Sequence, residues 1–325
     1  TGPTISAVTQ VVTPSNDTTP SYVFTTNEAG TITTNITEGF STSASAANGN
    51  NTVTFNTLGE GTYASKTVTV TDASGNASSL TLTTFVVDTT SPTAAITYDA
   101  VAPFKNGDAN VVITATFNGA VLDSPVPTIA IAGSGIAATS STVMTKTSST
   151  VYTYTYTVQT GDGTGTVTVG TGTDAAGNVV TSTPTSGATF TVDNTSPTAA
   201  ITYSYEAPYK NGGTNVTITA TFNGAVLDSP TPTIAIAGSG IANVSSANMS
   251  KTSTTVYTYT YAVPTGDGTG TVTVGTGTDA AGNVVTSTPT SGATFTVDNT
   301  APTFTFSPLN GAQGVDETVN ITITF

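Results

Sequence analysis

The chain contains no cysteine, histidine, tryptophan or arginine, and only 7% of its 325 residues are charged. Without cysteine there is no disulfide, no thiol nucleophile and no thiolate metal site, and nothing about compartment follows from cysteine usage. Without histidine, the commonest general base and the usual zinc ligand are missing. No apolar run approaches the roughly 18 residues that a membrane-spanning helix needs. These absences argue against catalysis and against membrane insertion of this segment.

Positive charge is also scarce, because the chain has five lysines and 19 acidic residues, which gives a net charge of -14. Such a balance argues against nucleic acid or an anionic membrane surface as a partner. Most of the acids are Asp residues in turn-like segments, which suits a hard cation bound by oxygen, such as calcium. The alternative is that Asp serves here as an ordinary turn residue and a solubilising charge.

Threonine, serine, glycine and alanine are abundant, in place of the charged residues that the chain lacks. β-branched residues alternate in short runs bounded by turn residues. This pattern predicts strands, and no segment shows a sustained helical period. In one repeat we predict seven strands near residues 94–98, 110–117, 127–132, 142–147, 151–158, 165–173 and 187–192. Seven short strands in about 105 residues predict an all-β chain of tandem immunoglobulin-like antiparallel β-sandwiches in an elongated array. Leu58, Gly61 and Tyr63 also resemble a tyrosine corner.

The chain repeats itself. Residues 88–192 and 193–297 differ at 17 of 105 positions, so that 88 are identical. The first 90 residues form a more distant copy with the same ending. We therefore predict Ig-like domains at 1–90, 91–195 and 196–300, and the first strands of a truncated fourth domain at 301–325. We expect the sequence to be an interior piece of a longer array, whose neighbouring repeats are its first partners.

The motifs "YKNGGTNVTITATFNGAV", "TVTVGTGTDAAGN" and "FTVDNTSPT" resemble the bacterial immunoglobulin-like repeats of very large surface adhesins. The resemblance covers nearly the whole chain. It implies an extracellular, cell-surface segment with no enzymatic activity, and repeats of this kind are commonly rigidified by calcium. One departure is Phe117-Asn118-Gly119, where such repeats often have Phe-Ser-Glu, so an acidic ligand that relatives would use there is absent.

The repeated Asp residues fall at predicted domain junctions. In a seven-strand sandwich, the loop after the sixth strand, here 174–178, returns to the pole where the linker with Asp88 enters. The loop with Asp123 reaches the same pole, and Glu60 lies on the preceding domain. Several carboxylates at one junction repel one another unless a cation lies among them, and calcium accepts about six to eight oxygens. We therefore predict calcium at the junctions, with Asx-type turns and a plain solvated linker as the alternative.

The same geometry repeats along the chain and defines the full candidate set. The predicted calcium ligands are Asp88, Asp123, Asp174 and Asn178 at the first junction, Asp162, Asp193, Asp228, Asp279 and Asn283 at the second, and Asp298 at the third. Asn194 at the second junction and Asp267 at the third lie beside these groups.

Three functions remain open from the sequence. The first is a non-enzymatic stalk that projects a distal module from a bacterial surface. The second is a self-assembling subunit of an extracellular filament, sheath or surface layer. The third is a carbohydrate-binding module that uses Tyr152, Tyr154 and Tyr156 on one strand face, for which the competing interpretation is a half-buried strand rich in aromatic β-formers. No pocket, nucleophile motif or histidine cluster accompanies the Asp residues, so we predict no catalytic activity. Any surface or glycan target is left unspecified.

Overall fold

The computed structural model describes residues 1–304 and confirms the predicted all-β class. These residues form 25 strands and contain no helix that is long and apolar enough to span a membrane. The chain divides into two compact units, Thr1–Asp193 and Asn194–Phe325, and each is described by itself below. Within the described residues, the first unit contains two hydrophobic cores and the second contains one.

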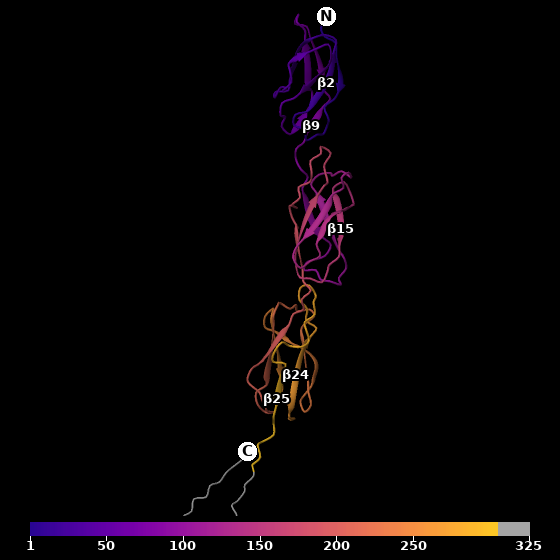
Figure 1. The fold of residues 1–325 in the computed structure, drawn as a ribbon. Helices are drawn as coiled ribbons and strands as arrows, with labels where there is room; N and C mark the ends of the chain where they lie inside the picture. Colours follow the sequence, from indigo (N-terminus) through magenta and orange to yellow (C-terminus); the bar gives the residue numbers. More distant parts are fainter. Residues whose placement is uncertain (305–325) are drawn as a thin grey trace, which may run out of the picture. The chain divides into compact units, whose positions relative to one another are not determined.

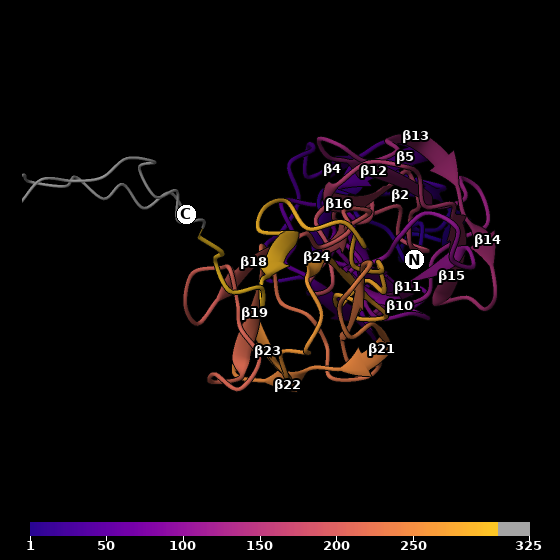
Figure 2. The same cartoon turned by 90° about the horizontal axis from the view of Figure 1, so that it is seen from below.

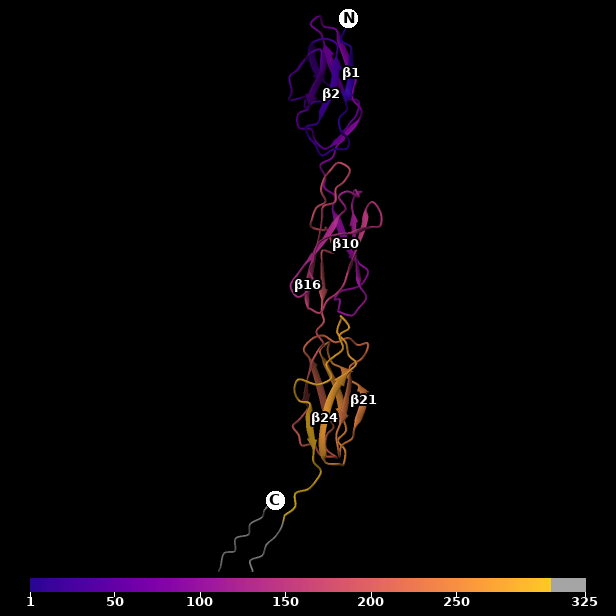
Figure 3. The ribbon, with the colours of Figure 1, turned by 45° about the vertical axis from the view of Figure 1, so that its right-hand side comes forward.

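The first sandwich contains β1 to β9. One sheet consists of β1 (Ile5–Thr9), β2 (Ser21–Thr26) and β5 (Gly49–Thr54), hydrogen-bonded in that order. The facing sheet has the order β4 (Ser45–Ala46), β3 (Gly30–Thr34), β7 (Thr67–Thr71) and β8 (Ala77–Thr81). A separate pair joins β6 (Gly61–Tyr63) to β9 (Phe85–Val87). Figure 3 shows β1 beside β2 in this sandwich.

The predicted tyrosine corner is present in the first sandwich. The Tyr63 hydroxyl donates a hydrogen bond to the Gly59 carbonyl at 2.9 Å, four residues upstream. The Tyr63 ring stacks on Phe85 with 5.0 Å between centroids, and Leu58 is buried. The corner therefore satisfies a hydroxyl while its ring extends the core.

The second sandwich contains β10 to β17. One sheet has the order β10 (Ala94–Tyr98), β11 (Val111–Phe117), β15 (Val151–Tyr156) and β14 (Thr145–Lys146). The other has the order β13 (Thr139–Val143), β12 (Thr128–Ala132), β16 (Gly163–Gly170) and β17 (Thr189–Val192). In immunoglobulin notation these sheets are A-B-E-D and C′-C-F-G, which is the arrangement of an Ig-like sandwich.

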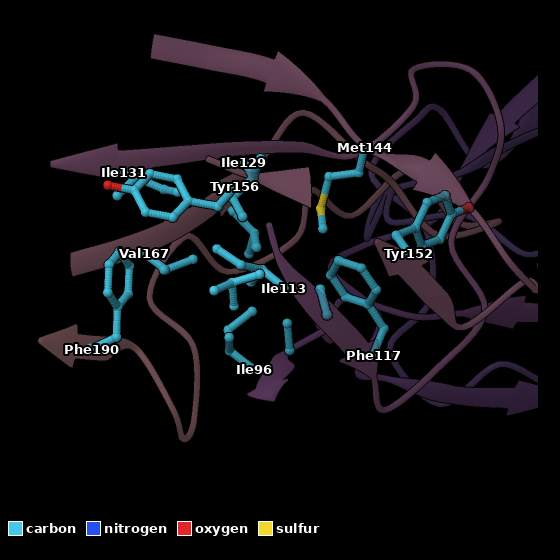
Figure 4. Packing of buried hydrophobic residues seen from close by; sticks show 14 of the residues in the cluster. Ile96, Ile113, Phe117, Ile129, Ile131, Met144, Tyr152, Tyr156, Val167 and Phe190 are labelled. Atoms are coloured by element: carbon cyan, nitrogen blue, oxygen red, sulfur yellow. The ribbon is translucent and has the colours of Figure 1, made fainter. Parts of the chain in front are cut away.

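Alternating residues of these strands build the core of the second sandwich. On β11, Val111, Ile113, Ala115 and Phe117 are buried, as their period of two predicts. Figure 4 shows side chains from both sheets pointing toward one another between the layers, with the Phe190 ring opposite Tyr156. Full burial of side chains of this size stabilises the sandwich by roughly 1.5–3 kcal/mol each.

The predicted strand at 142–147 is corrected in one respect. The segment is divided between the two sheets, because β13 pairs with β12 whereas β14 pairs with β15. Met144 lies between the two strands and is buried. The chain therefore crosses from one sheet to the other at this residue, and the buried thioether fills the core at the crossing.

The burial of the tyrosines on β15 bears on whether this strand face binds sugar or packs in the core. Tyr152 and Tyr156 on β15 are buried, and their hydroxyls donate to the carbonyls of Val121 (3.1 Å) and Ala137 (3.2 Å). Two of the three tyrosines considered for sugar binding are thus part of the core and Tyr154 is partly buried against it, which supports the half-buried-strand interpretation. Burial raises the pKa of the Tyr156 hydroxyl, so this group stays a protonated donor at neutral pH.

The third sandwich belongs to the second unit and contains β18 to β25. One sheet has the order β18 (Ala199–Tyr203), β19 (Val216–Phe222), β23 (Val256–Tyr261) and β22 (Ser250–Lys251), which Figure 2 shows side by side. The other has the order β21 (Val244–Asn248), β20 (Thr233–Ala237), β24 (Gly268–Gly275) and β25 (Thr294–Val297), with β24 beside β25 in Figure 1.

Each of the predicted ranges 1–90, 91–195 and 196–300 encloses one of the three cores. The exact boundaries stay predictions. Of the predicted fourth domain at 301–325, the residues from 305 onward lie outside the described part of the chain.

Candidate functional site

The candidate site in the first unit is centred on the loop from Asp174 to Asn178, which lies in the connection between the F and G strands of the second sandwich. The Asp174 Oδ1 atom accepts backbone N–H groups from Ala176 and Asn178, both at 2.9 Å. Gly177 has a φ of +92°, in the left-handed region that favours glycine. The spacing Asp-x-x-Gly-Asn therefore encodes a loop in which the carboxylate organises the backbone around itself.

Asn178 connects this loop to the linker. Its Nδ2 group donates to the Asp174 Oδ2 atom at 2.9 Å and to the Asp88 backbone carbonyl at 2.8 Å. The side chain is only 7% exposed. In addition, the Asn16 backbone N–H donates to the Ala176 carbonyl at 3.0 Å. The F–G loop of the second sandwich is thus hydrogen-bonded both to the linker and to a loop of the first sandwich.

The first sandwich holds the linker through Glu60. The Glu60 Oε2 atom accepts hydroxyl hydrogen bonds from Thr90 at 2.7 Å and from Thr89 at 3.0 Å. These two bonds, the Thr90 bond foremost, lower the pKa of the Glu60 carboxyl because they favour its charged form. The Asp88 Oδ1 atom accepts the Thr90 backbone N–H at 3.0 Å, which closes a turn after Asp88.

The second sandwich holds the other end of the linker. The Thr93 N–H donates to Asn118 Oδ1 at 2.9 Å, and the Asn118 N–H donates back to the Thr93 carbonyl at 3.0 Å. The Thr181 N–H donates to the Pro92 carbonyl at 2.8 Å. The short linker is therefore fixed by side chains or backbone groups of the two sandwiches at both of its ends.

Asp88 and Asp174 line one pocket of about 300 Å³, together with Thr90, Ser91 and Asn118. Carboxylate, hydroxyl and amide oxygens are the donor types that calcium prefers, so the lining fits this cation in its chemistry. Over residues 1–304, no group of three or more Asp, Glu, His or Cys residues is arranged to hold a metal. The pocket thus brings together two of the predicted carboxylates, and calcium stays a prediction.

Two predicted ligands are engaged in ion pairs. Asp123 pairs with Lys146 at 2.6 Å, and Asp228 pairs with Lys251 at 2.8 Å. The Tyr257 hydroxyl also donates to Asp228 at 3.1 Å. The lysine bond lowers the pKa of the Asp228 carboxyl. The carboxylates of Asp123 and Asp228 are therefore occupied by lysine ammonium groups.

The second unit repeats the Asp-x-x-Gly-Asn loop. The Asp279 Oδ1 atom accepts the N–H groups of Ala281 and Asn283, both at 2.9 Å, and Oδ2 accepts the Asn283 Nδ2 group at 3.0 Å. Asp193 ends the first unit, where its N–H donates to the Phe104 carbonyl at 2.9 Å. The proximity of Asp193 to Asp279 stays a prediction.

The remaining candidates lie near the exits of the second and third sandwiches. Asp162 packs closely on Gly135, because a Cβ atom placed on that glycine would lie 2.0 Å from the Asp162 carbonyl oxygen. Asp298 accepts the Thr300 N–H at 3.0 Å, and the Thr300 hydroxyl donates to Asp267. This bond lowers the pKa of the Asp267 carboxyl, so Asp267 holds its linker as Glu60 holds the first one.

Sequence reasoning missed the two threonines of the first linker and the backbone of Asn16. The threonines directly follow Asp88, but threonine is so frequent in this chain that their position carried no signal. The Asn16 contact uses only a backbone N–H, which no side-chain pattern marks.

Together these features define the class of protein, a series of Ig-like sandwiches with hydrogen-bonded linkers. No family model matches the chain, and no curated protein matches it. Among solved structures, it is similar to the Escherichia coli adhesin FdeC at 13% identity and a TM-score of 0.35, covering 91% of this chain and 97% of that chain. It is also similar to three N-terminal domains of the outer capsid protein Hoc of bacteriophage RB49 at 12% identity and a TM-score of 0.34, covering 92% and 100%.

Replacing Asn178 by Ala should loosen the first junction, because it removes the bonds to Asp174 and to the Asp88 carbonyl. We expect the free energy of local opening to fall by about 1–3 kcal/mol, the cost of leaving buried polar groups unpaired. Hydrogen exchange of the 88–93 linker, measured on the whole chain, should accelerate. Asn76→Ala is the matched control, since Asn76 makes the same bond to Asp72 within the first sandwich (2.8 Å). Unchanged exchange at 88–93 in Asn178→Ala would show that the linker does not depend on this amide.

Acid should release the linker from Glu60. The folded-state pKa is lowered below the ordinary value of 4.5, so these bonds stabilise the junction above that value and are lost as the pH falls through the folded pKa. In an NMR titration, the Glu60 carboxyl carbon should titrate below 4.5, and the amides of Thr89 and Thr90 should shift with the same midpoint. Glu60→Gln should abolish the shared transition. A midpoint at or above 4.5 contradicts the assignment.

Proposed function

We propose that this chain is a non-enzymatic extender segment of an extracellular bacterial surface adhesin, in which successive sandwiches carry a binding module away from the cell. The observation that carries the proposal is the first junction. A linker of only a few residues is hydrogen-bonded to the preceding sandwich through Glu60 and to the following one through Asn178 and Asn118. An extender needs such joints, because bending at free linkers would shorten its reach.

The surface chemistry supports the same proposal. The strands expose mainly threonine on the faces that point away from the cores, as on β16, where Thr alternates with buried Gly165, Val167 and Val169. Charged residues make up only 7% of the chain, so few long side chains are offered to ionic partners. The resemblance to bacterial Ig-like adhesin repeats, drawn from the motifs above, supports the extracellular, cell-surface location.

We further propose that calcium binds in the pocket lined by Asp88 and Asp174. A cation there would draw the linker carboxylate toward the F–G loop of the next sandwich, and so would limit bending between them. Ser91, Thr90 and Asn118 line the same pocket and supply oxygen atoms. Asp174 already accepts N–H donors on both oxygens, so the loop is held in place before any ion binds. Such preorganisation reduces the ordering cost of binding.

An extender should be an elongated monomer in solution. Sedimentation velocity and small-angle scattering of residues 1–325, over a wide concentration range, should give one constant mass and a maximum dimension that reflects sandwiches in series. A filament, sheath or surface-layer subunit would instead give a mass that grows with concentration. That outcome would reject the extender and favour assembly.

Calcium should stiffen the first junction and raise the melting temperature. At a hundredfold excess over the dissociation constant, binding to the folded state alone stabilises by about 2.7 kcal/mol. Asp88→Asn keeps an oxygen acceptor for Thr90 and should leave the calcium-free protein folded, yet weaken calcium binding in calorimetry. Asp123→Asn is the matched control, because Asp123 pairs with Lys146, and it should keep the calcium response. Scattering profiles that superimpose with calcium and with chelator would contradict this role.

A further inference from the structure

The third sandwich contains a pocket whose lining includes residues that its near-duplicate lacks. The pocket has a volume of about 500 Å³ and lies along the loop between β18 and β19, with Tyr203, Tyr205, Glu206 and Tyr209 in its lining. Of the 17 differences between the two copies, six fall within 99–110, which is this loop in the second sandwich. There, Ala100, Val101 and Phe104 replace Tyr205, Glu206 and Tyr209. The differences are therefore concentrated in this loop and in a second segment, 138–149.

The backbone that carries these residues is the same in both copies. The N–H of Tyr209 donates to Thr296 and that of Phe104 to Thr191, each at 2.9 Å. Both rings are buried, with Tyr209 only 1% exposed. Both copies thus bury an aromatic ring at this position, whereas the residues at 205 and 206 differ from those at 100 and 101. Val101, the counterpart of Glu206, is 93% exposed and contributes nothing to the core.

In the third sandwich the extra side chains form an aromatic wall. The Tyr205 ring lies edge-to-face against Tyr209 with 5.1 Å between centroids, and Tyr203 lies 6.0 Å from Tyr209. The hydroxyls are tied down, since Tyr209 donates to the Tyr205 carbonyl at 3.1 Å and Tyr203 donates to the Gly292 carbonyl at 2.7 Å. Tyr205 is 38% exposed, so it offers solvent a large ring that is held in one orientation.

Polar side chains line the pocket together with the Tyr205 ring. Glu206 is exposed, and within residues 1–304 its carboxylate makes no hydrogen bond or ion pair. Thr202 and Thr294 add two hydroxyls to the lining, each able to donate and to accept. A pocket with one fixed aromatic platform and a few convergent polar groups is typical of a small-ligand site.

We propose that this pocket binds a neutral pyranose sugar, stacked by its C–H face on Tyr205 and hydrogen-bonded through its hydroxyls to Glu206 and the two threonines. Acidic sugars and nucleotides would be repelled by Glu206 and by the net charge of -14. A quaternary ammonium ion would need several exposed ring faces around one point, but Tyr209 is 1% exposed and leaves Tyr205 as the main platform. This site does not depend on the extender function or on calcium.

Titration of the whole chain with methyl glycosides of glucose, galactose and mannose tests the proposal. Saturation-transfer NMR, with irradiation of the tyrosine ring protons, should transfer magnetisation to the C–H protons of at least one glycoside. Tyr205→Ala should weaken binding about tenfold, and Glu206→Gln should weaken it by a similar factor. Tetramethylammonium chloride is the competing probe.

The near-duplicate sandwich provides the matched controls. The double variant Tyr205→Ala/Glu206→Val restores the residues found at 100 and 101, where the sandwich folds, and should abolish sugar binding without changing the circular dichroism spectrum. Conversely, Ala100→Tyr/Val101→Glu/Phe104→Tyr in the second sandwich should add a second site and double the stoichiometry. The proposal is overturned if no glycoside binds, if the double variant binds as well as the parent, if the graft adds no site, or if tetramethylammonium alone binds.

Discussion

A β-sandwich buries every second residue of its strands, and this period determines where chemistry can be placed in the chain. On β11 the alternate positions form the core, and threonines and a valine occupy the others. A cluster of carboxylates is therefore not expected on the buried faces of the strands, because burying an unpaired charge there would cost free energy. Asp174, Glu60 and Glu206 all lie in loops between strands, where water or a ligand can reach them. Both the junction and the tyrosine pocket follow from this constraint.

The local pattern was sufficient to predict most strands of the second sandwich. The predicted strand at 94–98 coincides with β10, and the others agree within a few residues, because alternation and turn residues act over short distances. The exception is the crossing at Met144. A strand that exchanges one partner for another keeps the same alternation, so the change is visible only once both sheets exist. Tyr152 shows the same limit, since the period of two places the ring on a face without stating which face is inside.

The candidate site was predictable to the extent that topology alone determined it. The F–G loop of a sandwich returns to the pole where the chain enters, and Asp88 and Asp174 do line one pocket. The contacts of these carboxylates could not be predicted from the sequence. An Asp in a short loop can bind either the backbone amides of that loop or a cation, and the loop sequence is the same in both cases. The structure shows the amide bonds for Asp174. Those bonds leave lone pairs on the oxygens, so an organised loop and a cation site are compatible.

The two near-identical sandwiches separate what the fold requires from what it merely permits. Phe104 and Tyr209 make the same backbone contacts, so the ring belongs to the fold and the added hydroxyl does not. That hydroxyl would be costly to bury alone, but it donates to the Tyr205 carbonyl. A main-chain carbonyl at that position is supplied by any residue, including Ala100 in the other copy. The change from Phe to Tyr therefore needs no second substitution to be tolerated, and the neighbouring exposed positions can vary without cost to the core. A repeat of this architecture can thus acquire a binding surface in the A–B loop while its neighbours keep the structural role.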